Sequence, residues 1–251
     1  MNQSSDAGMM CQDVGKPEAR LPPDLPQDAE TMLKDGGLLA VADALLKCPH
    51  TLLQAVLRGN RRVGIYLLLL MLGCSAAYGL TMGSFSGGMQ LWAVPVKSMG
   101  MVLFSALLCL PSLYILAAWG GSDRTLSQMT GILLQSLGLA GLLLVGFAPI
   151  AWIFSQSTAS IGFMGMLHLI FWGVSLVVGF RLIFQSFDDQ PTGRPVGILK
   201  FWCVVFVAVL LQMSTVLRPV IGPAEHVMEY GKKSFITHLF ENLDQTPARR
   251  R

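Results

Sequence analysis

Two polar side chains within one apolar segment are the first candidates for chemistry in this sequence. His168 and Ser175 are seven residues apart in the apolar run 160–184, so a helix would place both on the same face. A buried histidine can relay a proton or bind a metal or a haem, and a serine beside a histidine base can act as a nucleophile. At this spacing, however, the two side chains lie about 10 Å apart along a helix, which is too far for a direct hydrogen bond.

The other groups that such chemistry needs are missing from the apolar segments. The only acidic residues between positions 63 and 217 are Asp123, Asp188 and Asp189, and the other histidines lie outside the spans proposed below. The sequence contains no His-Glu-x-x-His, Gly-x-Ser-x-Gly or Walker motif. We therefore expect no enzyme, no catalytic or metal-binding residue and no cofactor. His168 is interpreted as a neutral side chain bonded to a neighbouring helix, with a functional role as the alternative.

Glutamines and small residues are the remaining candidates inside the apolar segments. Gln135 and Gln212, like Gln128 and Gln156, line a pore or, as we favour, hydrogen-bond between helices. Small residues let helices approach closely, which supports tight packing or self-association. The glycines singled out for this role are Gly79, Gly83, Gly138, Gly141, Gly162 and Gly165.

The composition that surrounds these residues is typical of a membrane protein. Only 13% of the residues are charged, about half the fraction of about 25% found in soluble domains. A helix needs about 20 apolar residues to cross the hydrocarbon of a bilayer. The sequence predicts an all-α polytopic transmembrane bundle with about five spans, at 63–82, 95–119, 128–154, 160–184 and 198–217.

The segments outside the spans differ in character. Residues 1–27 are polar and proline-rich, which predicts disorder. Residues 28–62 have apolar side chains at helical spacing on both sides of Pro49, which predicts two amphipathic helices on the bilayer surface, or a hairpin that binds a soluble partner. Residues 218–251 form an extra-membrane tail in which 235–243 read as an interfacial helix. The tryptophans expected to anchor span ends at the interface are Trp92, Trp119, Trp152 and Trp202.

Basic residues near span ends indicate the orientation. Positive charge is enriched on the cytoplasmic side of membrane proteins, and more basic residues flank one side of the five spans than the other. We expect a cytoplasmic N-terminus in a bacterial inner membrane, with these topology determinants on the cytoplasmic side: Arg58, Arg61, Arg62, Arg124, Arg181 and Arg194.

The layout from about Arg62 to Gly222 resembles the Yip-like group of multispanning membrane proteins. A polar N-terminal region precedes closely spaced apolar helices joined by short links, and Arg218-Pro219-Val220-Ile221-Gly222 follows the last span, with Phe240-Glu241-Asn242 later. The resemblance implies a non-enzymatic membrane protein, and in eukaryotic relatives it implies adaptors for small GTPases and membrane shaping. The long C-terminal tail departs from that pattern, and the short N-terminus lacks a recognisable GTPase-binding region, so the GTPase role is not carried over.

These observations favour a scaffold, membrane-organising component or complex subunit that works by helix packing. Its expected partners are the lipid bilayer and a second copy of the chain or another membrane protein, and no nucleic acid, because the basic residues form no continuous patch. The alternative is a transport, channel or permease subunit with a separate partner. A membrane-embedded enzyme acting on lipid or peptide is a third hypothesis.

Overall fold

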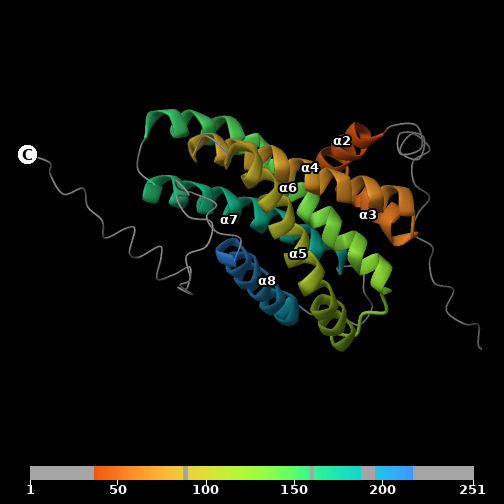
Figure 1. The fold of residues 1–251 in the computed structure, drawn as a ribbon. Helices are drawn as coiled ribbons and strands as arrows, with labels where there is room; N and C mark the ends of the chain where they lie inside the picture. The colour runs from red at the N-terminus through yellow and green to blue at the C-terminus, as the bar shows by residue number, and fades with distance from the viewer. Residues whose placement is uncertain (1–36, 87–89, 159–160, 188–195, 217–251) are drawn as a thin grey trace, which may run out of the picture.

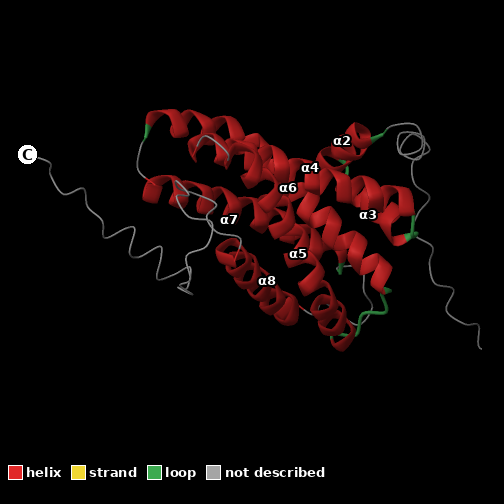
Figure 2. Cartoon of the chain, in the orientation of Figure 1, coloured by secondary structure: helices red, strands yellow, loops and turns green. Residues whose placement is uncertain are grey.

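A computed structural model describes residues 37–86, 90–158, 161–187 and 196–216 of the chain. In this described part the ordered elements are all α-helices, as Figure 2 shows, which confirms the all-α prediction. Two short helices, α2 (Leu38–Lys47) and α3 (Pro49–Leu57), come first. Five long helices follow: α4 (Arg61–Ser86), α5 (Gln90–Trp119), α6 (Leu126–Ser157), α7 (Ile161–Ser186) and α8 (Val196–Val216).

Each long helix is long and apolar enough to cross a membrane, so the chain is a multispanning membrane protein. The helices extend beyond the predicted spans at most of their ends. The largest difference is in α5, which begins at Gln90 instead of Pro95. Pro95 stands inside the helix and is buried against Gly79 of α4, whose missing side chain leaves room for the proline ring. The predicted interfacial helix of the tail and the predicted disordered N-terminus lie outside the described residues.

Local signals in the sequence set the turn between α5 and α6. Gly121 has a positive φ of 84°, and the N–H of Ser122 donates to the carbonyl of Ala117, which closes the end of α5. Thr125 then caps α6 in a capping box: the backbone N–H of Thr125 donates to Oε1 of Gln128, and the backbone N–H of Gln128 donates to Oγ1 of Thr125. The turn therefore leaves few backbone groups without partners at this end of the bundle.

The five long helices pack in the order α7, α6, α4, α5 and α8, with α4 in the middle (Figure 1). α4 packs between α5 and α6, α7 packs against α6, and α8 packs against α5. The outermost helices of this order, α7 and α8, contact each other through aromatic side chains. The ring centroid of Phe180 in α7 lies 6.2 Å from that of Trp202 and 5.6 Å from that of Phe206 in α8. These rings fill the space between the two helices.

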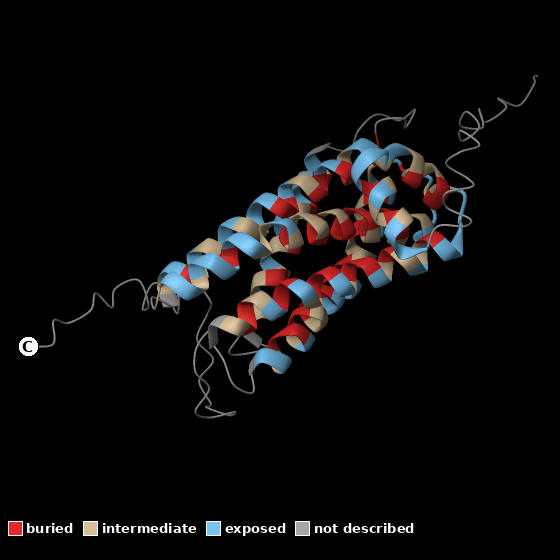
Figure 3. Cartoon of the chain, turned by 90° about the horizontal axis from the view of Figure 1, so that it is seen from above, coloured by how far each residue is buried: buried red, intermediate tan, exposed pale blue. Residues whose placement is uncertain are grey.

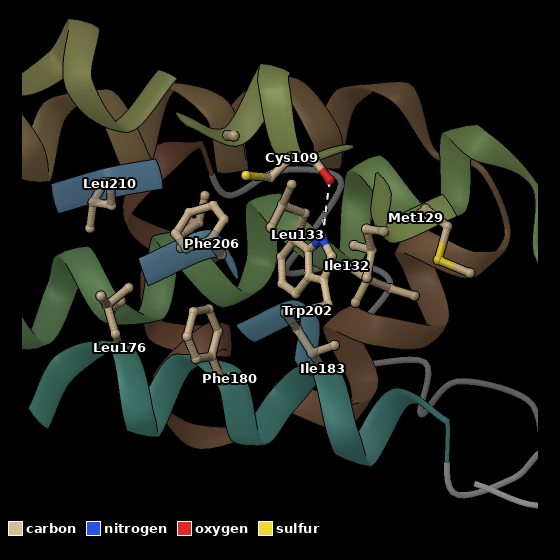
Figure 4. Close-up of a cluster of buried hydrophobic side chains, with 14 of the residues drawn as sticks. Cys109, Met129, Ile132, Leu133, Leu176, Phe180, Ile183, Trp202, Phe206 and Leu210 are labelled. Atoms are coloured by element: carbon tan, nitrogen blue, oxygen red, sulfur yellow. Dashed lines mark hydrogen bonds between the residues drawn. The ribbon is translucent and has the colours of Figure 1, made fainter. Parts of the chain in front are cut away.

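Trp202 is part of the core and not of an interfacial belt. Its side chain is fully buried, and its indole N–H donates to the carbonyl of Cys109 and the hydroxyl of Ser112, both at 3.1 Å (Figure 4). The prediction that Trp202 anchors the helix at the interface is therefore wrong. Burial is possible here because α5 satisfies the one polar group of the ring. The other three predicted anchors are exposed, at 76% for Trp92, 80% for Trp119 and 52% for Trp152.

The outward faces of the long helices are apolar. Figure 3 shows buried residues on the inner sides of the helices and exposed residues around them. Exposed positions carry large apolar side chains, which suits contact with lipid and not with water. Examples from four helices are Ile65, Leu69, Leu107, Leu108, Ile170, Val177, Phe201 and Val204.

The apolar stripes of α2 and α3 face protein. Val41 and Leu45 of α2 and Leu52 and Val56 of α3 are buried in a cluster with residues of α4 and α6. The sequence had assigned these stripes to the bilayer surface. The stripes pack against protein instead, because the adjacent surface of α4 and α6 is also apolar. The absence of a side chain at Gly138 leaves room there for Leu45.

Three of the glycines proposed for helix packing lie at close contacts within the chain. A Cβ atom at Gly79 would lie 2.8 Å from Cα of Pro95, and one at Gly141 would lie 2.9 Å from Cβ of Cys74. Gly138 meets Leu45, as described. Gly179, which the sequence analysis did not select, is also tight, because a Cβ atom there would lie 2.6 Å from the carbonyl oxygen of Ser136. Of the other candidates, Gly83 is buried, and Gly162 and Gly165 are partly exposed.

Replacement of Gly179 with alanine should destabilise the bundle. The added methyl group would press on the backbone of α6 and separate α6 from α7, at a cost of about 1–3 kcal/mol for overpacking. Unfolding in mixed micelles as the fraction of dodecyl sulfate rises would measure this loss. The matched control is Gly73→Ala in α4, where nothing lies within 4 Å of the added Cβ. Equal stability of the two variants would contradict the observed packing.

Candidate functional site

His168 forms a buried hydrogen bond with Tyr78. The phenol oxygen of Tyr78 in α4 lies 2.8 Å from Nδ1 of His168 in α7, and the two rings meet edge to face with 5.6 Å between their centroids. Tyr78 is fully buried and His168 is 3% exposed. Trp172, one turn further along α7, also meets the Tyr78 ring edge to face at 6.4 Å. This contact joins α7 to α4 at the ends of these helices away from Arg61.

The geometry gives His168 a structural partner. One of its two ring nitrogens is taken by the phenol, and the ring of Tyr78 is buried in an apolar cluster with Met82, Val94 and Leu144. Among the residues that the structure describes, no three His, Cys, Asp or Glu side chains gather as a metal site. The arrangement can hold a neutral imidazole, and it joins two helices that are not neighbours in sequence.

Ser175 does not join this pair. Its side chain is fully buried three residues beyond Trp172 in α7, and its hydroxyl has no hydrogen-bond partner among the described residues. The hydroxyls of Ser105 in α5 and Ser136 in α6 are in the same condition. Sequence reasoning singled out Ser175 but missed the other two, since a serine within an apolar run gives little indication of the direction in which it points.

The glutamines of α6 bind the short helix α3. Nε2 of Gln128 donates to the carbonyl of Leu57, and Nε2 of Gln135 donates to the carbonyl of Pro49, both at 2.8 Å. Leu57 is the last residue of α3, where carbonyls lack partners in their own helix. These bonds between helices match the role favoured for Gln135 from the sequence. Gln212, the other candidate, lies on the exposed side of α8.

Arg124, in the turn before α6, contacts the end of α7. Its guanidinium Nη2 donates to the carbonyl of Ser186 at 2.5 Å, and the group lies 5.8 Å from the centre of the Phe187 ring. A cation at the end of α7 complements the negative end of the helix dipole and caps a free carbonyl. Sequence reasoning found Arg124 as a topology determinant but could not find the helix that it caps. Arg58, Arg61, Arg62 and Arg181 are exposed, and Arg194 lies outside the described residues.

Comparison with known proteins identifies no relative. No family profile, no curated protein and no solved structure matches the chain. The resemblance to the Yip-like group therefore stays a prediction.

Replacing His168 with leucine should destabilise the protein more than replacing both members of the pair. The single change leaves the buried Tyr78 hydroxyl without its partner, at a cost of about 1–3 kcal/mol. In Tyr78→Phe/His168→Leu both polar groups are absent, so part of that loss should return, as a double-mutant cycle in micelles would measure. Strictly additive losses would show that the hydrogen bond contributes nothing.

Proposed function

We propose that this chain is a non-catalytic component of a membrane assembly, a scaffold or subunit that works through helix packing. The observation that carries the proposal is that polar side chains in the bundle form hydrogen bonds between helices of the same chain. The imidazole of His168 binds the phenol of Tyr78, and the amides of Gln128 and Gln135 bind the backbone of α3. The groups with most capacity for chemistry are thus engaged in joining helices of the same chain.

The inner part of the bundle supports the same proposal. Phe180, Trp202 and Phe206 lie together with Leu133 and Ile132 in one buried cluster between α5, α6, α7 and α8 (Figure 4). A region filled in this way offers little room for a substrate. The surface available to partners is then the apolar outward face, which suits lipid and other membrane helices.

Charge supports an orientation with the N-terminus in the cytoplasm. Because consecutive long helices alternate in direction, the start of α4, the turn before α6, the end of α7 and the start of α8 come to one end of the bundle. Arg61, Arg124, Arg181 and Lys200 belong to these segments. We propose that this end faces the cytoplasm of a bacterial cell, in which case the membrane is the inner membrane. The Yip-like group remains the proposed family.

The proposal predicts that the Tyr78→Phe/His168→Leu variant keeps the biological activity of the protein. Cells that lack the protein would be complemented with the variant, at matched protein levels, and the phenotype of the deletion scored. A packing role tolerates the loss of both polar groups so long as the bundle forms. Loss of complementation by a variant that inserts and folds normally would indicate a proton or ligand role for His168. Gly73→Ala, on the outward face of α4, is the control.

A transport subunit is the second candidate, and the buried serines favour it. Three hydroxyls without described partners, on α5, α6 and α7, are unusual in a bundle of this polarity, and such groups are candidates for contact with a passing solute. Flux into liposomes that contain the chain and its co-purifying partners would test this. Flux that is lost in Ser136→Ala/Ser175→Ala would support transport, and no flux with every partner present would oppose it.

A further inference from the structure

The helix α3 runs along α6 and not across its end. Its last carbonyl, at Leu57, binds Gln128, and its first carbonyl, at Pro49, binds Gln135. Gly131, between the two glutamines, meets a side chain of α3 at very close range. Since Gln128 and Gln135 are seven residues apart, α3 extends along α6 for about 10 Å, in the opposite direction.

The end of α2 contacts α6 close to the place where α3 begins. The side chain of Leu45 reaches Gly138, where Leu67 and Leu70 of α4 also lie within 4 Å of the Cβ position. Gly138 is three residues further along α6 than Gln135, which binds the start of α3. The segment that joins α2 to α3, between Leu45 and Pro49, therefore lies seven to ten residues further along α6 than Gln128, which binds the end of α3.

The start of α4 indicates where the membrane begins. Cys74 faces Gly141 and Leu70 faces Gly138, so α4 and α6 run side by side with an offset that brings Arg61 near the level of Gln128. Arg61 and the adjacent arginine are exposed, and arginines at the end of a span mark the headgroup layer. The turn at Cys48 then lies about 10 Å further into the hydrocarbon.

We propose that α2 and α3 form a re-entrant hairpin that enters the bilayer from the side on which α4 begins and ends within that leaflet. The proposal does not depend on the proposed function. Figure 1 shows the pair against the flank of α4 and α6. This position differs from the bilayer surface expected from the sequence, because the contacts descend along α6 over two turns.

Several backbone groups at the turn have partners within the protein, which favours burial in hydrocarbon, where no water can bond them. The N–H of Cys48 donates to Ala44 at 2.8 Å, and the N–H of Thr51 donates to Cys48 at 3.1 Å. Pro49, the first residue of α3, has no N–H to satisfy. The free carbonyl at the other end of α3 is taken by Gln128.

The exposed face of α2 can also enter a leaflet. Leu39 is 84% exposed and Leu46 is 57% exposed, so both are free to contact acyl chains. The two charges on this face form an ion pair, with 2.8 Å between Nζ of Lys47 and Oδ1 of Asp43. Pairing removes the net charge, and the lysine side chain extends back along α2 as a snorkelling side chain does.

Cys48 supplies the test, because it is exposed at the turn. The full-length chain would carry Cys48 alone, with the other cysteines replaced by serine, and a nitroxide on its sulfur, in vesicles of phosphatidylcholine and phosphatidylglycerol. Two controls in a cysteine-free chain are Leu69→Cys, which is exposed on α4 about 12 Å beyond Arg61, and Asn60→Cys, which is exposed in the turn before α4. Collision rates with oxygen and with a water-soluble nickel complex give the depth of each label.

The hairpin predicts that the label at Cys48 resembles the one at Leu69→Cys, with oxygen access high and nickel access at least about fivefold below that at Asn60→Cys. Nickel access equal to that at Asn60→Cys would overturn the proposal. Should the substitutions impair folding, the unaltered chain can be treated in lipid nanodiscs, where both faces of the bilayer meet water, with a charged methanethiosulfonate and its Cys48 peptide weighed. No modification until detergent is added supports the hairpin, and rapid modification in intact nanodiscs refutes it.

Discussion

The absence of water around most of this chain is the constraint from which the rest of the structure follows. Hydrocarbon offers no hydrogen bonds, so a polar group within the bundle is stabilised by a partner in the protein, although the hydroxyls of Ser105, Ser136 and Ser175 have none among the described residues. Four hydrogen bonds supply such partners. They join the imidazole of His168 to the phenol of Tyr78, the indole of Trp202 to the carbonyl of Cys109, the amide of Gln128 to the end of α3, and the guanidinium of Arg124 to the end of α7. Each also connects elements that are distant in sequence, so satisfying polar groups and fixing the tertiary fold are the same process.

Close packing supplies the remaining cohesion. Apolar side chains gain little by leaving lipid for a protein interior, so helices in a membrane associate where their surfaces approach closely. The central helix α4 achieves this on two sides, with Gly79 against α5 and Cys74 against Gly141 of α6. Gly179 performs the same role between α6 and α7. Gly79, Gly141 and Gly179 thus mark three separate contacts on three helices, whereas nothing lies within 4 Å of a Cβ added at Gly73.

The parts of this structure that sequence could predict are those that depend on length and polarity. A run of about 20 apolar residues identifies a span in any context, and the five spans were predicted in this way. The two short helices beside Pro49 were predicted from apolar side chains at helical spacing. Their partners were not, because a helix that is apolar on all sides gives no sign of which face meets protein. Trp202 and Tyr78 illustrate this: in sequence both resemble interfacial aromatics, and only a hydrogen-bond partner on another helix allows them to be core residues. The start of α5 at Gln90 was missed for a related reason, since the glycine that accommodates Pro95 belongs to α4.

The placement of α2 and α3 beside only one half of the bundle has a geometric consequence. With the hairpin inserted as proposed, seven helices of the described residues share one leaflet and five share the other, so this part of the protein tapers across the bilayer. Lipids around a tapered inclusion are crowded on its wide side and spread on its narrow side. Bending that expands the crowded monolayer relieves this difference, and the chain would then have its lowest energy where the membrane already bends in that sense. Shape alone would thus give this protein a preferred location along a membrane, with no ligand or partner required to direct it there.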